Sequence, residues 1–314
     1  MFLRGKVVFV KKEKSIIWLR CIATLLITNS HFTRLYPGGF SFLSFGGLFG
    51  NSLFFLLSGY CLTNIRTSFP EWYFKRIKRL YLPDALLLPF LLLSAHPFFP
   101  TPLYILFPIE PFHFLPTIIT LYPVYYLCLW LHQKGWLKLY HSLAFAVAFQ
   151  LLYYFLILDY RNANMTQHYS VLGLTSYLII MLLGGILKMD YVPKPLRDRR
   201  LLIPGAAVAF VFYVAQSFFP FSGVLKILQW ILAIMFAFCV SAALITFEER
   251  LPVFRLENRL ADMTLEIYIV QQLIIGPFAT ENFPVGIILC VISIFAVACC
   301  LHEWTLFVER RLKL

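Results

Sequence analysis

Two residues of one long apolar stretch, Arg20 and His31, have the types and spacing that acid–base chemistry inside a membrane requires. In an α-helix their separation corresponds to about 16 Å of rise and about three turns, so both side chains lie on one face. Thr24 and Ile27 fall on the same stripe. Because a histidine titrates near neutral pH, it is a natural general base. The pair therefore predicts a polar line that connects two depths of a bilayer.

A structural interpretation of the same pair stays open. Arg20 and His31 lie toward opposite ends of the apolar stretch, where long or polar side chains reach the headgroups on either side. Ionisable residues inside a span are costly, however, and more often functional than structural. We therefore take Arg20 and His31 as candidate catalytic residues.

A second candidate site is the basic cluster Lys75, Arg76, Lys78 and Arg79. Arg76 and Arg79 are three residues apart and therefore neighbours on one face of a helix. Residues 71–81 mix these cations with aromatics just before Pro83, which is typical of an interfacial helix. The cluster either meets anionic lipid or binds phosphates, which arginine grips with two parallel hydrogen bonds.

Small residues at 46–60, among them Ser58 and Gly59, also allow two interpretations. They let helices approach closely in lipid, or they leave a narrow passage for a substrate tail. Farther along, Glu266, Gln271 and Gln272 predict a polar interior face on one span, whereas His113 fits an interfacial position. The seven cysteines all lie in apolar stretches without metal-ligand spacing, so we expect packing roles, no disulfide and no metal.

The composition predicts that these residues sit in a membrane. The chain has 60% hydrophobic and 13% charged residues and a mean hydropathy of +0.77, far from the balance of soluble domains. Segments long enough to cross about 30 Å of hydrocarbon recur along it. We predict an all-α polytopic membrane protein with about ten transmembrane helices, at 16–36, 48–65, 81–98, 115–131, 141–158, 170–188, 201–219, 225–246, 264–281 and 284–308.

The distribution of charge predicts the orientation and excludes a nucleic-acid partner. Of the 27 Lys and Arg residues behind the net charge of +12, all but Arg34, Arg161 and Lys226 fall in one alternating set of connections. The positive-inside rule then places both termini in the cytoplasm. The connections are too short to bury a core, so we expect residues 1–314 to form a single transmembrane domain without an appended soluble domain.

Taken together, the motifs resemble those of the membrane-bound acyltransferase-3 family, ten-helix enzymes that O-acylate bacterial surface glycans. The resemblance covers nearly the whole chain and has four parts: an Arg-x10-His pair at 20 and 31, a Gly-x-x-x-Phe-Phe-x-x-Ser-Gly stretch at 50–59, an Arg-x-x-Arg pair at 76 and 79 before a proline, and a late Ile-Tyr-containing stretch at 264–271. Gln271 stands where the family has a histidine, and Asn51-Ser52 stands for Val-Asp, so the family roles are not carried to those positions.

The resemblance implies an O-acyltransferase of the bacterial cytoplasmic membrane, with cytoplasmic acyl-CoA, most often acetyl-CoA, as donor and no metal. The implied acceptor is a hydroxyl of a surface or lipid-linked glycan, such as lipopolysaccharide, O-antigen, capsule or exopolysaccharide. Arg76 and Arg79, assisted by Lys75 and Lys78, would hold the phosphates. The pantetheine arm would pass Ser58-Gly59. His31 would deprotonate the acceptor or carry the acyl group, and Arg20 would orient the donor.

Two other classes of protein remain as alternatives. A transporter or flippase of a lipid-linked sugar also needs many spans with interior polar groups, but it gives no reason for the Arg-x-x-Arg pair beside the Arg-x10-His pair. A structural assembly partner is the third class. Release of a free thiol from acetyl-CoA in the presence of an acceptor distinguishes the enzyme from both.

Overall fold

The computed structural model describes residues 13–93, 114–157, 171–189, 192, 198–216, 218, 223–278 and 283–312. This part of the chain is helical and has no strand. Its elements are α1 (Lys14–Ser30), η1 (Phe32–Arg34), η2 (Gly38–Leu43), α2 (Gly47–Leu62), α3 (Phe69–Leu93), α5 (Phe114–Gln133), α6 (Leu139–Leu152), η3 (Tyr153–Ile157), α7 (Val171–Lys188), α8 (Arg199–Ala215), η5 (Gly223–Lys226), α9 (Ile227–Thr246), η6 (Glu248–Arg250), α10 (Arg255–Asp262), α11 (Thr264–Phe278) and α12 (Val285–Leu312).

Six described helical segments are long and apolar enough to cross a membrane: Gly38–Leu62, Phe114–Gln133, Leu139–Ile157, Val171–Lys188, Ile227–Thr246 and Val285–Arg311. Each overlaps one of the expected spans. Three other expected spans fall on α1, α8 and α11, which are 17, 17 and 15 residues long. The all-helical, polytopic membrane architecture is therefore confirmed. The count of ten and the cytoplasmic termini stay predictions.

The helix α3 differs from expectation. The sequence predicted an interfacial helix at 71–81 and a separate span from 81, but α3 is continuous from Phe69 to Leu93 and runs through Pro83. A proline removes one main-chain hydrogen bond, which a helix in a membrane tolerates where neighbours pack around it. Pro83 is buried, and α3 packs against α5, α11 and α12. The remainder of the expected span 81–98 lies outside the described residues.

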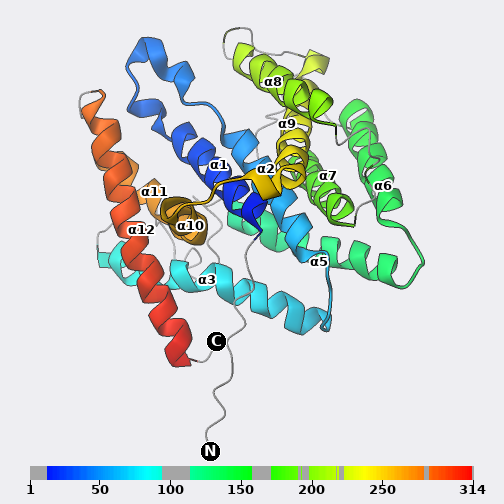
Figure 1. Cartoon of the computed structure of the whole chain (residues 1–314), viewed down its shortest axis with the longest axis horizontal. Coiled ribbons are helices and arrows are strands. Elements are labelled where there is room, and N and C mark those ends of the chain that lie inside the picture. Colours follow the sequence, from blue (N-terminus) through cyan, green and yellow to red (C-terminus); the bar gives the residue numbers. More distant parts are fainter. Residues whose placement is uncertain are drawn as a thin grey trace, which may run out of the picture.

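The helix α2 is at the centre of the bundle, in contact with α1, α7 and α9. Figure 1 shows α1 and α2 between α12 at one edge of the molecule and α6 at the other. A Cβ atom at Gly59 would collide with the main-chain oxygen of Met181, and one at Gly184 would collide with that of Leu56. The main chains of α2 and α7 therefore approach closely because both residues lack side chains.

Polar contacts fix the beginning of α1. The Glu13 carboxylate accepts hydrogen bonds from Lys188 Nζ at 2.9 Å and from Tyr60 Oη at 3.0 Å. The main-chain N–H of Lys14 donates to Glu248 Oε1 at 3.0 Å. These contacts join the start of α1 to α2, α7 and η6, and so they determine where the face that carries Arg20 lies.

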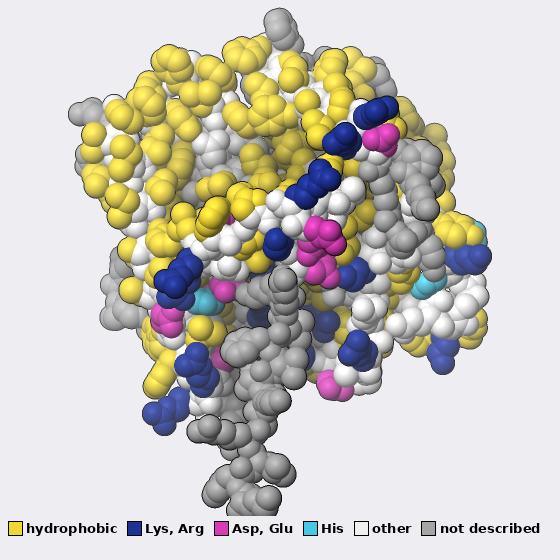
Figure 2. Space-filling model, viewed as in Figure 1, with side chains coloured by type: hydrophobic (Ala, Val, Ile, Leu, Met, Phe, Trp, Pro, Cys, Tyr) yellow, Lys and Arg dark blue, Asp and Glu magenta, His cyan; other side chains and the backbone are white. Residues whose placement is uncertain are grey.

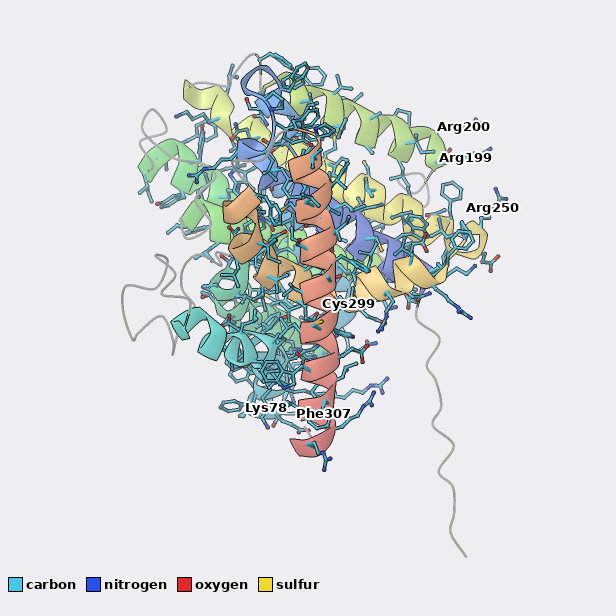
Figure 3. The ribbon with its side chains drawn as sticks, turned by 90° about the vertical axis from the view of Figure 1, so that its left-hand side faces the viewer. Lys78, Arg199, Arg200, Arg250, Cys299 and Phe307 are labelled. Atoms are coloured by element: carbon cyan, nitrogen blue, oxygen red, sulfur yellow. The ribbon has the colours of Figure 1, made fainter. Side chains whose placement is uncertain are left out.

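The surface separates into apolar and charged regions. Figure 2 shows hydrophobic side chains over the upper part of this face, whereas Lys and Arg side chains follow a diagonal band below it. Arg199 and Arg200 at the start of α8 and Arg250 in η6 lie at one edge of the molecule in Figure 3. This grouping agrees with the expectation that the connections before α8 and after α9 face the same side of the membrane.

Candidate functional site

A cavity of about 620 Å³ lies between α1, α2, α3, α5, α10 and α11. We call it the cationic cavity because of the charged and polar residues along its wall, which are Arg20, Ser58, Asn64, Arg66, Thr67, Glu71, Lys75, Arg76, Arg79, Asp262 and Thr264. Its five cations and two carboxylates give a net charge of +3. A concave, partly apolar space with convergent charged groups is the form that small-molecule sites take, and this one favours an anion.

The cavity brings together five of the eight residues that the sequence singled out: Arg20, Ser58, Lys75, Arg76 and Arg79. Gly59 faces the main chain of α7 instead, so its structural interpretation is the one that the contacts support. Lys78 is exposed outside the cavity wall, on another face of α3, and Figure 3 shows it at the lower edge of the molecule. His31 also lies outside the cavity wall.

Arg76 is held in place by the helix turn before it. Its Nη1 donates to the main-chain oxygen of Trp72 at 2.6 Å, and its guanidinium carbon lies 3.9 Å from the centre of the Trp72 ring. Trp72 in turn packs edge-on against Tyr122 of α5, with ring centroids 5.7 Å apart. The buried Arg76 Nε has no hydrogen-bond partner among the described residues. The guanidinium is thus held in one position on the cavity wall.

Arg20 brings a cation from α1 to the same space. Its Nη1 donates to the main-chain oxygen of Ala261 in α10 at 3.3 Å, and it interacts electrostatically with Arg79 and Asp262. Arg79 and Asp262 come from α3 and α10, so three helices place charge around Arg20. The sequence analysis missed Arg66 and Asp262 as wall residues. Arg66 belongs to the same basic segment as Lys75, whereas nothing in the sequence connects Asp262 to Arg20.

The face of α1 that carries Arg20 and His31 packs along α11. Three hydrogen bonds join the two helices at successive levels, and we call them the polar seam: Thr24 Oγ1 to Thr264 Oγ1 at 3.4 Å, Thr28 Oγ1 to Gln271 Oε1 at 2.8 Å, and Gln272 Nε2 to the His31 ring at 3.2 Å. The predicted same-face placement of Arg20 and His31 agrees with this geometry. Of the three residues expected on one interior polar face of α11, Gln271 and Gln272 lie in this seam, whereas Glu266 faces α12.

Glu266 and His302 form a buried hydrogen-bonded pair on the other side of α11, which the sequence did not predict. Glu266 Oε1 lies 2.9 Å from His302 Nδ1 of α12, and the two side chains are only 6% and 13% exposed. Neither residue lines the cationic cavity. The sequence placed His302 near a span end without a role, because only the fold brings α12 beside α11. His113, for which an interfacial position was expected, lies outside the described residues.

Comparison with known proteins identifies the family. Neither the curated proteins nor the solved structures give a match. A family model described as an acyltransferase domain, acyltransferase-3, matches residues 13–303, a stretch that contains the cationic cavity and the polar seam. Because this match covers far more than half of the chain, the protein belongs to the acyltransferase-3 family and is a membrane-embedded acyltransferase.

Proposed function

We propose that the protein transfers an acyl group, acetyl in the first instance, from cytoplasmic acyl-CoA to a hydroxyl of a cell-surface or lipid-linked glycan in the bacterial cytoplasmic membrane. The observation that carries the proposal is the cationic cavity, which combines a net positive wall with an apolar end and lies beside the helix that holds His31. A coenzyme A thioester has the matching form, with phosphates at one end and a slim uncharged arm at the other.

The donor would enter with its phosphates among the side chains of α3. Arg76 is preorganised on Trp72, and Arg79 and Lys75 lie beside it on the cavity wall. Arg66, at the connection between α2 and α3, adds a fourth cation there. Charge-assisted hydrogen bonds from such a cluster to phosphate oxygens are among the strongest in proteins. Lys78 lies outside this wall and takes no part in the proposal.

The arm of the donor would follow the wall of α2 and α11. Ser58 lines the cavity from α2 and offers a hydroxyl to the polar amide groups of the pantetheine arm. Thr264 of α11 and Arg20 of α1 line the same cavity. Arg20 thus supports the donor at the point where the cavity meets the polar seam.

His31 would act as the general base at the far end of the seam. Its ring accepts the proton of the glycan hydroxyl while the hydroxyl oxygen attacks the thioester carbonyl carbon. A carbon–oxygen bond forms, the carbon–sulfur bond breaks, and the proton on His31 passes to the coenzyme A thiolate. Gln272, 3.2 Å from the ring, holds the imidazole in orientation. His31 lies at the end of α1 opposite its start, which we place on the cytoplasmic side. The acceptor therefore approaches His31 from the other side of the membrane.

Cys61 provides a direct test of the donor site. It is exposed and lines the cavity, and none of the seven cysteines forms a disulfide, so the other six can be replaced by serine. We expect acetyl-CoA, which unlike coenzyme A has no free thiol that would itself consume maleimide, to slow maleimide labelling of the Cys61-only protein about tenfold at saturation. The control is a single cysteine introduced at Lys134, which is exposed in the connection between α5 and α6 and lies outside the cavity wall. Unchanged labelling of Cys61 would contradict the donor site.

The acceptor is tested in cells. We expect mass spectrometry of surface polysaccharide to show an acyl ester in cells that carry the gene and its loss when the gene is deleted. Identical acylation in both strains contradicts a glycan acceptor, whatever the outcome of the labelling experiment.

A further inference from the structure

Aromatic residues form one end of the cationic cavity. On α2 the wall residue nearest the Gly47 end is Phe54, on α5 the wall residue farthest from Gln133 is Phe114, and on α11 the last wall residue is Tyr268. The Gln133 end of α5 lies at the opposite, charged end of the cavity, because Gln133 Nε2 donates to the main-chain oxygen of Ile65. All three helices therefore contribute an aromatic ring at the end remote from the arginines.

These rings contact one another. The centroids of Phe54 and Phe114 are 5.8 Å apart, and those of Phe114 and Tyr268 are 5.3 Å apart. The main-chain N–H of Phe114 also donates to Tyr268 Oη at 3.1 Å, so the position of the Phe114 ring is tied to α11. We call Phe54, Phe114 and Tyr268 the aromatic wall. Contacting rings at these separations pack favourably and resist displacement.

The aromatic wall lies between the charged part of the cavity and His31. Tyr268 and Gln272 are one turn apart on the same face of α11, about 6 Å along the axis, and Gln272 contacts the His31 ring. A donor whose phosphates meet Arg76 therefore directs its acyl end toward the wall, and the thioester lies within about one turn of the seam end that carries the base.

We propose that the aromatic wall is the acyl pocket of the donor site and restricts it to short acyl groups. The inference rests on the proposed coenzyme A site. Leu57, Ile118 and Leu265 line the cavity beside the wall and supply an apolar surface for the acyl group. The methyl group of an acetyl thioester ends before the aromatic rings. Each methylene added to the acyl chain must displace one of the rings of the aromatic wall.

The test compares acetyl-CoA with butyryl-CoA as protectants of Cys61 against maleimide, in the full-length protein whose other cysteines are serine. An apolar pocket discriminates about tenfold or more for each methylene. We therefore expect acetyl-CoA to protect at concentrations at least tenfold below those of butyryl-CoA. We call the protective concentration of butyryl-CoA divided by that of acetyl-CoA the selectivity ratio. In Phe54→Ala, which removes a ring from the wall, the selectivity ratio is expected to fall about tenfold. Phe54→Leu should shift it in the same direction by less.

The matched control is Phe55→Ala. Phe55 also contacts Phe114, with ring centroids 5.2 Å apart, but it is fully buried and does not line the cavity. In Phe55→Ala the ratio of the protective concentrations of butyryl-CoA and acetyl-CoA is expected to equal that of the parent protein. If Phe54→Ala fails to insert, Phe54→Leu carries the test.

Two negative outcomes are distinguishable. Absence of protection of Cys61 by both acetyl-CoA and butyryl-CoA contradicts the proposed function. Protection by acetyl-CoA with equal protection by butyryl-CoA in the parent protein, or with an unchanged ratio in the Phe54 variants, contradicts only the acyl pocket.

Discussion

Neighbouring cations of α3 have different surroundings although the sequence presents them as one cluster. Lys75, Arg76 and Arg79 line the cationic cavity, whereas Lys78 points away from it. At about 100° per residue, position 79 falls between 75 and 76 on the helix surface, whereas 78 falls about 60° on the other side of 75, outside the arc that lines the cavity. The side of α3 that faces the cavity depends on its packing against α5 and α11, which the sequence does not provide.

This difference gives a matched pair of variants. Arg79→Ala removes a cation from the cavity wall, and we expect the dissociation constant for coenzyme A to rise about tenfold, since a charge-assisted contact to phosphate is lost. Lys78→Ala removes the same charge from the same helix and should leave the dissociation constant within twofold. Isothermal titration of the purified protein measures both. Equal weakening by the two variants would show that only the general charge of α3 matters.

His31 is the second residue whose role is testable by substitution. In His31→Ala the acceptor hydroxyl loses its base, so the rate of acyl transfer should fall about 10²- to 10⁴-fold, while acetyl-CoA still protects Cys61 from maleimide because the cavity wall is intact. Acyl-ester formation on glycan measures the first effect. His141→Ala, at an exposed position of α6, is the control and should retain full activity. Retained transfer in His31→Ala would refute the assignment.

Single residues also show the limit of sequence reasoning about the site. Arg20 and His31 were found because helix geometry places them on one face. Their partners Ala261 and Gln272 were not, because 241 residues separate each pair and no local pattern records the contact. The contact between Glu266 and His302, which are 36 residues apart on adjacent helices, was not predicted for the same reason.

At the scale of elements, apolar length predicted the spans well, and short-range signals predicted their boundaries less well. The six long apolar segments all fall on expected spans. The break expected before Pro83 is absent, since packing around α3 outweighs the local preference of a proline to end a helix. The small residues near Ser58 were predicted either to pack or to form a passage; Gly59 packs against α7, whereas Ser58 lines the cationic cavity and its role in a passage stays a prediction.

The close contact of α2 with α7 gives a prediction at this scale. Gly59→Ala and Gly184→Ala each place a methyl group against a main-chain oxygen, so the helices must separate. Overpacking of this kind costs about 1–3 kcal/mol. We expect a lower midpoint of thermal aggregation, measured by fluorescence-detected size-exclusion chromatography. Gly276→Ala in α11 is the control, because a Cβ there meets nothing within 4 Å. An unchanged midpoint for both α2 and α7 variants would contradict the close approach.

At the scale of the whole molecule, the distribution of Lys and Arg is the signal that sets orientation. Only Arg34, Arg161 and Lys226 depart from the alternation of the other cations. The described connections before α8 and after α9 lie at the same edge, as the alternation requires (Figure 3).

The orientation is tested with reporters. Green fluorescent protein fused after residue 314 should fluoresce, because it folds in the cytoplasm, and alkaline phosphatase at the same position should be inactive. Fusions placed after Arg34 should give the reverse pair of signals. Active phosphatase at the C-terminal position would overturn the predicted cytoplasmic C-terminus, and a fluorescent, phosphatase-inactive fusion after Arg34 would overturn the assignment of His31 to the outer side.

The contacts that hold α1 have a consequence for how the protein is made. Lys14 meets Glu248 from 234 residues later, and Arg20 meets Ala261 from 241 residues later. The helix α1 is synthesised first. Arg20 therefore lies in the membrane without these partners while more than two hundred further residues are synthesised. The cationic cavity, whose wall includes residues of α10 and α11, therefore assembles late in biogenesis, and a nascent chain interrupted before α10 has its first helices but lacks part of this wall.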